Sequence, residues 1–189
     1  GVLDYMNEYN FKQFVLAIKD AGFISKKLIT SDITLDFAYT LYLRLLKDPS
    51  IDKTKVKNYV QRWYVMSTLT GRYISSPESA MDLDLRRIKE KGFLPWLEEV
   101  EKTLSDTFWN VELVQNLETS SVNSPVFNVF IAAQINQNCN SFLMRSPSLI
   151  IGIKTQYSFV FSCHSLHSKS GTPGILTKFI ITPYTIINI

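Results

Sequence analysis

The sequence predicts an all-α fold, an irregular array of about seven helices, followed by a β-prone or disordered tail. Two observations support this. Apolar residues recur mostly at three- and four-residue spacing up to about position 137, which is typical of helices with one buried face. Short connections marked by glycine, proline or serine separate these stretches, and no convincing strand pattern precedes residue 145. The expected helices are 10–21, 33–47, 53–70, 77–91, 95–103, 106–117 and 125–137.

Short polar signals bound the first two expected helices. Asn10 can cap the first helix, and Gly22 ends it. Its apolar face consists of Phe11, Phe14, Val15 and Ile18. Ser31 or Asp32 can cap the second helix, and the pair 48–49 (Asp-Pro) ends it. The connector between them is expected to be extended or to form one turn.

The third and fourth expected helices meet at a tight turn. Asp52 or Thr54 can cap the third helix. Gly71 ends it, because glycine best tolerates the left-handed conformation after a helix. Ser76 caps the fourth helix, with Pro77 at its first position. The sequence therefore predicts a helix–turn–helix corner between residues 62 and 87.

The last three expected helices begin at similar signals. Gly92 closes the fourth helix, and Pro95 begins the fifth, with Trp96, Leu97 and Val100 facing inward. The pair 105–106 (Ser-Asp) caps the sixth helix, and the pair 124–125 (Ser-Pro) begins the seventh. One side of the seventh helix repeats Phe127, Phe130, Ile131 and Gln134.

The chain changes character near residue 145, so we predict a helical domain at 1–145 and an atypical tail at 146–189. All 17 acidic residues lie at or before Glu118. The tail contains β-prone runs such as SLIIGI and YSFVF, broken by Gly, Pro and Ser. These runs fit either a pair of short strands or a disordered segment.

Composition excludes several classes of function. Hydrophobic content is 46% and charged content 20%, as in ordinary globular proteins. A net charge of +3 is too small to indicate nucleic-acid binding by itself. No apolar run has the length of a membrane span. Two cysteines fit a cytoplasmic location. The nucleotide-binding, nucleophile and metalloprotease motifs are absent, so we expect no cofactor and no small-molecule substrate.

The predicted corner contains four arginines that can gather near one place, at positions 62, 72, 86 and 87. Arg72 and Tyr73 follow the glycine stop and are expected to be exposed, whereas Asp82 and Arg86 can pair at i,i+4. A solvated, salt-bridged surface is the commoner explanation of such a cluster. The alternative is contact with nucleic-acid phosphates. The candidate nucleic-acid-binding residues are Arg62, Arg72, Tyr73, Ser75, Ser76, Arg86 and Arg87.

Other candidate sites are weaker. Cys163, His164 and His167 offer at most three zinc ligands, and no second ligand pair exists, so we predict no metal site. Three carboxylates are expected on a solvated helix face, namely Glu98, Glu99 and Glu101. Helical spacing places most aromatic residues in the core, among them Trp63, Tyr64, Trp96, Phe108 and Trp109. We predict no catalytic residue.

The stretch RW-x-VMS-x-LTGRY-x-SSPES, at 62–79, is followed by D-x-DLRRI at 82–88. AGFISKKLI at 21–29, DTFWNVELVQNL at 106–117 and SPVFNVFIAAQ at 124–134 flank it. In this order the segments resemble the helical middle of a large bacterial family. Its members carry a ParB-like N-terminal domain of formerly unknown function and often a C-terminal HNH-like nuclease domain. The GmrSD-type modification-dependent restriction systems belong to it.

The resemblance implies a non-catalytic helical fragment of a phage-defence protein. It would link the sensing domain to the nuclease domain, both absent from this chain, and contact DNA through the arginines. Divalent metal and nucleotide are implied for the full-length family only. The alternative is a helical protein-interaction or scaffold module with no nucleic-acid role.

Nuclease-bearing relatives continue into a motif resembling D-V-H-H-I-F-P-K, whereas this chain reads FSCHSLHSK at 161–169. The Asp, the adjacent His pair and the Pro-Lys are missing, so the HNH-like motif is not intact. One explanation is that the tail is the same gene translated in another reading frame. The loss of every acidic residue after Glu118 fits this hypothesis, and the coding DNA would test it.

Overall fold

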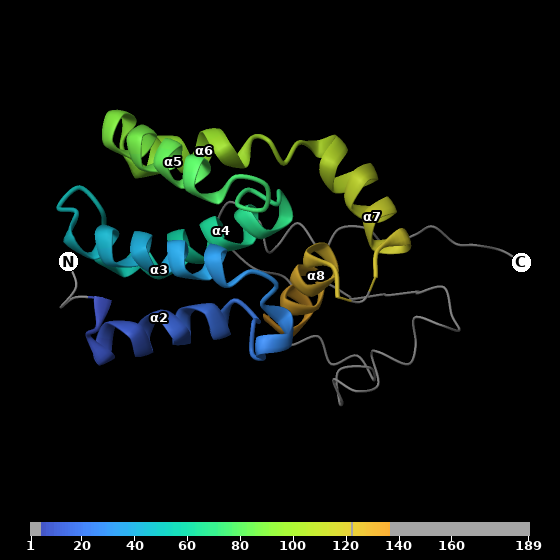
Figure 1. The fold of residues 1–189 in the computed structure, drawn as a ribbon, viewed down its shortest axis with the longest axis horizontal. Coiled ribbons are helices and arrows are strands. Elements are labelled where there is room, and N and C mark those ends of the chain that lie inside the picture. The colour runs from blue at the N-terminus through green and yellow to red at the C-terminus, as the bar shows by residue number, and fades with distance from the viewer. Residues whose placement is uncertain (1–4, 122, 137–189) are drawn as a thin grey trace, which may run out of the picture.

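The computed structural model describes residues 5–121 and 123–136, and this part of the chain is all-α, as predicted (Figure 1). It contains seven α-helices and no strand. The expected domain boundary near residue 145 and the tail at 146–189 lie outside the described residues. The helices are α2 (Glu8–Asp20), α3 (Asp32–Lys47), α4 (Val56–Leu69), α5 (Pro77–Lys91), α6 (Phe93–Glu101), α7 (Leu113–Thr119) and α8 (Pro125–Asn136).

Helix α4 is the centre of the packing. It contacts α2, α3 and α8, and it runs beside α3 near the middle of the described fold in Figure 1. Its second half is apolar nearly all round, and Trp63, Tyr64, Val65 and Met66 are each no more than 1% exposed. A helix that is apolar on every side needs partners on every side, so the other helices surround it. None of the described helices combines the length and the apolar character needed to cross a bilayer.

The start of α2 differs from the prediction. Asn7, not Asn10, is the N-cap, and its side chain accepts a hydrogen bond of 3.1 Å from the backbone N–H of Asn10. The helix therefore begins one turn before the apolar pattern does. Phe11, expected in the buried face, is 51% exposed and contacts the ring of Tyr39. The connector to α3 contains one 3₁₀ turn, η1 (Lys26–Leu28), in agreement with the sequence.

The structure decides between the alternative N-caps that the sequence left open for the second and third expected helices. Ser31 caps α3 through a 3.1 Å bond from the N–H of Thr34. Asp52 accepts a 2.9 Å bond from the N–H of Thr54, but it caps a 3₁₀ turn, η2 (Lys53–Lys55), that precedes α4. As a result α4 begins at Val56, later than the expected 53.

The helices after Gly92 begin in different ways. Gly92 has a φ of 87° and joins α5 directly to α6, so α6 starts at Phe93 rather than at Pro95. Proline is tolerated in the first turn because the N–H groups there have no helical partner. The expected helix 106–117 is divided into a π-helical turn, η3 (Phe108–Glu112), and α7. Helix α8 starts at Pro125, where Ser124 accepts a 3.1 Å bond from the N–H of Phe127.

Helix α8 packs closely against the α2–η1 connection. A Cβ atom at Gly22 would lie 1.8 Å from the carbonyl oxygen of Ala132, so only glycine fits there. The side-chain amide of Asn128 donates a 3.2 Å hydrogen bond to the carbonyl of Lys27. Two segments that are about a hundred residues apart in sequence, 21–29 and 124–134, are therefore direct neighbours.

Candidate functional site

The predicted corner begins where α4 ends. Thr70 is the C-cap residue of α4, and Gly71 follows it with a φ of 60°. The N–H of Arg72 bonds to the carbonyl of Ser67 at 3.0 Å, and the N–H of Gly71 bonds to that of Thr68 at 3.4 Å. This pair of bonds is the Schellman arrangement, and it reverses the chain direction. It turns Arg72 and the residue after it back towards the protein interior.

Asp84, on α5, is the centre of the corner. It is 0% exposed and is the sole fully buried charged residue among those described. Its carboxylate accepts hydrogen bonds from Arg72 Nε at 2.9 Å and from Arg72 Nη2, and from Tyr73 Oη at 2.8 Å. It also accepts a 2.9 Å bond from Trp96 Nε1, on α6. A buried carboxylate is stable only when its charge and its lone pairs are both satisfied, and this one satisfies both.

The guanidinium of Arg72 lies between two indole rings. Its central carbon is 5.7 Å from the ring centroids of both Trp63 and Trp96. Burial lowers the pKa of Arg72, but the hydrogen bonds and the charge of Asp84 outweigh it and raise that pKa. The arginine therefore remains charged and completes a buried ion pair that joins the turn, α4, α5 and α6.

Tyr73 extends the network to α4. It is 3% exposed, and its hydroxyl donates to Asp84 while accepting a 3.1 Å bond from Trp63 Nε1. Burial, with the negative charge of Asp84, raises the pKa of the Tyr73 hydroxyl well above its usual range. The expectation that Arg72 and Tyr73 are exposed is wrong, because the turn after Gly71 points both side chains inward.

Arg62 also forms an ion pair within the fold. Its guanidinium forms a two-bond contact with Glu101, one bond being 2.9 Å from Nε to Oε1. The two side chains are 28% and 15% exposed, so the pair is partly shielded from water. Hydrogen bonding to Glu101 raises the pKa of Arg62. The expectation that Glu101 lies on a solvated face is wrong, whereas Glu98 and Glu99 are exposed, and Glu99 pairs with Lys91 at 2.6 Å.

The remaining candidate residues face outward. Arg86 pairs with Asp82 at 2.7 Å, and both side chains are 65% exposed, which confirms the predicted i,i+4 pair. Arg87 is 43% exposed and pairs with Glu90 at 3.1 Å. Ser75 and Ser76 are exposed, and Ser76 occupies the N-cap position of α5 without a side-chain capping bond. The four arginines are thus divided between internal ion pairs and an exposed helix face.

Sequence reasoning missed the roles of Asp84, Trp96 and Glu101. A signal for Asp84 was present, since it precedes the buried Ile88 by four residues and so lies in the apolar stripe of α5. An acidic residue in such a stripe requires a buried cation or donor. The partner Arg72 could not be identified from spacing, because the two residues belong to different elements.

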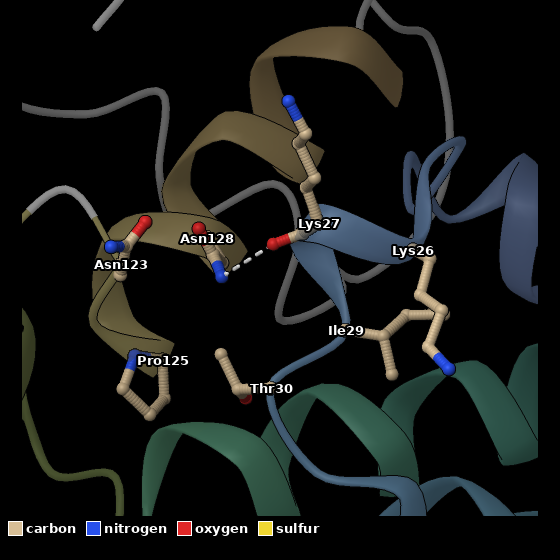
Figure 2. Close-up of a pocket in the computed structure, with 7 residues that line it drawn as sticks. All are labelled: Lys26, Lys27, Ile29, Thr30, Asn123, Pro125 and Asn128. Atoms are coloured by element: carbon tan, nitrogen blue, oxygen red, sulfur yellow. Dashed lines mark hydrogen bonds between the residues drawn. The ribbon is translucent and has the colours of Figure 1, made fainter.

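A shallow cleft of about 600 Å³ lies elsewhere, between η1 and the start of α8 (Figure 2). It includes none of the predicted site residues. Its lining consists of Lys26, Lys27, Ile29, Thr30, Asn123, Pro125 and Asn128. The two lysine side chains point in different directions in Figure 2, so they do not converge on one anion.

Within residues 5–121 and 123–136, no group of three or more His, Cys, Asp or Glu side chains is placed to hold a metal ion. Cys163, His164 and His167 lie outside the described residues. Comparisons of the chain with protein-family models, with curated proteins and with solved structures find no match.

Proposed function

We propose that this chain is a helical connecting module of a modification-dependent, restriction-type protein of the GmrSD kind. In this proposal it joins an N-terminal sensing domain to an HNH-like nuclease domain in the cytoplasm and carries no catalytic residue of its own. The supporting observation is that the residues on which the resemblance rests form the contacts that hold the fold together.

Two groups of these residues form packing contacts between separate elements. Trp63, Arg72, Tyr73 and Asp84 all belong to the resembling stretch at 62–88, and they form one hydrogen-bonded network. The resembling segments 21–29 and 124–134 pack against each other. Residues that form such contacts build a scaffold rather than a reactive centre, which favours a connecting role.

The four candidate arginines differ in their availability for the proposed contact with DNA. Arg62 and Arg72 are held in ion pairs with other elements, whereas Arg86 and Arg87 project from α5 and form exposed ion pairs with residues of the same helix. Exposed pairs of this kind are weak and exchange readily for another anion. We therefore assign the DNA contact of this module to Arg86 and Arg87.

Fluorescence anisotropy with short DNA duplexes, with and without modified cytosine, tests this contact. The expected result is salt-dependent binding, and replacing both Arg86 and Arg87 with alanine should lower the salt slope by about 2. Arg44→Ala, at an exposed arginine of α3, is the matched control and should leave the slope unchanged. Equal slopes in all three proteins would exclude the proposed DNA surface. Arg72→Ala is unsuitable for this purpose, because it breaks a buried ion pair.

The connecting role has a separate test in the coding DNA. We expect an in-frame ParB-like domain upstream, and an HNH-like motif in an adjacent frame across residues 146–189. Absence of both would contradict the proposed family relationship, whatever the outcome of the DNA-binding assay.

A protein-interaction module is the alternative function, and the exposed apolar side chains in and just ahead of α2 favour it. Tyr9 and Met6 are 70% and 76% exposed. A defined protein partner, together with no DNA binding at any salt concentration, would support this alternative.

A further inference from the structure

Exposed apolar side chains concentrate at one helix. Of the ten large hydrophobic residues that are exposed in the described part of the chain, five lie in or just ahead of α2. These five, which we call the α2 patch, are Tyr5, Met6, Tyr9, Phe11 and Leu16, each between 46% and 76% exposed. Scattered exposed hydrophobic residues are normal in proteins, but a concentration on one element indicates an interaction surface.

The patch has a definite direction. Tyr9 and Leu16 are separated by seven residues within α2, so they lie along one side of the helix, whereas Tyr5 precedes the N-cap Asn7. Helix α2 packs against α3 and α4 and lies at the edge of the described fold (Figure 1). The side chains of Tyr9 and Leu16 therefore form a stripe that faces away from the core.

The aromatic end of the patch is already fixed in place. Tyr39 donates a 2.9 Å hydrogen bond from its hydroxyl to the carbonyl of Tyr5, and the two rings lie 5.0 Å apart. Phe11 contacts the same Tyr39 ring edge-on at 5.6 Å. Because these side chains are held before any partner arrives, binding to them costs less conformational entropy.

The charges beside the stripe indicate what can cover it. Glu8 lies near the amino end of α2 and Lys19 near its carboxyl end, about three turns apart on the same side of the helix. Glu8 is exposed and pairs with Lys12 at 2.7 Å. A second α2 running antiparallel brings each Glu8 opposite Lys19 of the other copy, twice in one interface, while the apolar stripes meet between them.

We propose that the α2 patch is the interface of a homodimer in which two copies of this chain pair their α2 helices antiparallel. A two-fold axis perpendicular to the helices gives the same contacts to both copies and leaves no free interface. A parallel arrangement would place like charges together, which is unfavourable.

Sedimentation velocity of the full 189-residue chain tests the proposal. Because one helix face is smaller than a standard interface, we expect a monomer–dimer equilibrium with a Kd of roughly 10–100 µM. Replacing Tyr9 and Leu16 with glutamate should weaken dimerisation at least about tenfold. Ile74→Glu and Leu83→Glu, at exposed apolar residues outside the patch, are the matched controls and should leave the Kd unchanged.

Charge exchange tests the orientation. Glu8→Lys and Lys19→Glu should each weaken the dimer by roughly fivefold, and combining them should restore it, because the opposite charges meet again. A chain that stays monomeric above about 200 µM, roughly twice the weakest expected Kd, overturns the dimer. Self-association that is equal in the Tyr9/Leu16 variant overturns the role of α2. A double charge variant no tighter than the single ones overturns the antiparallel arrangement.

Discussion

Replacing Asp84 with alanine should destabilise this fold more than any other single loss of charge. The change removes the carboxylate that neutralises Arg72 and that accepts bonds from Tyr73 and Trp96. All three donors remain in place after the substitution. Water has little access to replace the bonds of Tyr73 and Trp96, because Asp84 is 0% exposed in the native protein.

The magnitude follows from the burial of the two partners. Removing one member of a buried ion pair costs about 3–5 kcal/mol. The Arg72 side chain is 19% exposed, so water can solvate part of it, and we expect the lower end, about 3 kcal/mol. A domain of this size has about 5–15 kcal/mol of stability in total, so the variant should remain folded but be much weakened.

Urea unfolding followed by tryptophan fluorescence and by circular dichroism measures this effect. With a typical slope of about 2 kcal/mol per molar urea, the midpoint should fall by about 1.5 M. Asp82→Ala removes an exposed carboxylate from the same helix and should change stability by less than about 0.5 kcal/mol. Replacing Arg72 with methionine and Asp84 with leucine together should recover part of the loss, since neither charge remains buried. A midpoint for Asp84→Ala equal to that of Asp82→Ala would refute the assigned role.

The other predictions concern packing, a second ion pair and pH. Gly22→Ala should lower the free energy of unfolding by about 3 kcal/mol, because the new Cβ would clash with the backbone of α8 and the residue has a φ of 97°. Gly71→Asn, at a φ of 60°, should lower it by less than about 1 kcal/mol. Equal unfolding midpoints for these two variants would contradict this account of Gly22. Arg62→Ala should cost about 1–2 kcal/mol, and a double-mutant cycle with Glu101→Ala should show a coupling of about 1 kcal/mol, while additive effects would argue against the pair. Burial raises the pKa of Tyr64 to about 12, so between pH 10 and that value the unfolded chain releases a proton that the folded protein keeps. Stability should therefore fall with rising pH by roughly 1.4 kcal/mol per unit from this residue, and unfolding measured at several alkaline pH values should show a shallower slope in Tyr64→Phe.

Helix existence and helix ends were predictable because their causes are local. Gly22, Gly71 and Gly92 each follow a predicted helix and each have a positive φ. The spacing of apolar residues likewise predicted a helix at 53–70 with one buried stripe, and the i,i+4 rule identified the Asp82–Arg86 pair. Each inference depends on residues within about one or two turns of one another.

The exact starts of α2, α4 and α6 were less predictable. Several polar residues near each start can cap a helix, and packing selects among them. Asn7 caps α2 one turn before the apolar pattern begins, so the pattern could not identify it. Asp52 uses its capping bond for a 3₁₀ turn instead of for α4.

By itself, the sequence determined an all-α chain over the described residues, with a basic and aromatic corner between α4 and α5. Only the tertiary structure decided which of those charges are internal. Arg72 and Asp84 belong to different elements, and Arg62 meets Glu101 from another helix. A charge on an isolated helix faces water by default, and it becomes buried only when a second element brings it a partner that offsets the loss of hydration. That partner is a property of how the helices pack, and no local pattern in the sequence specifies it.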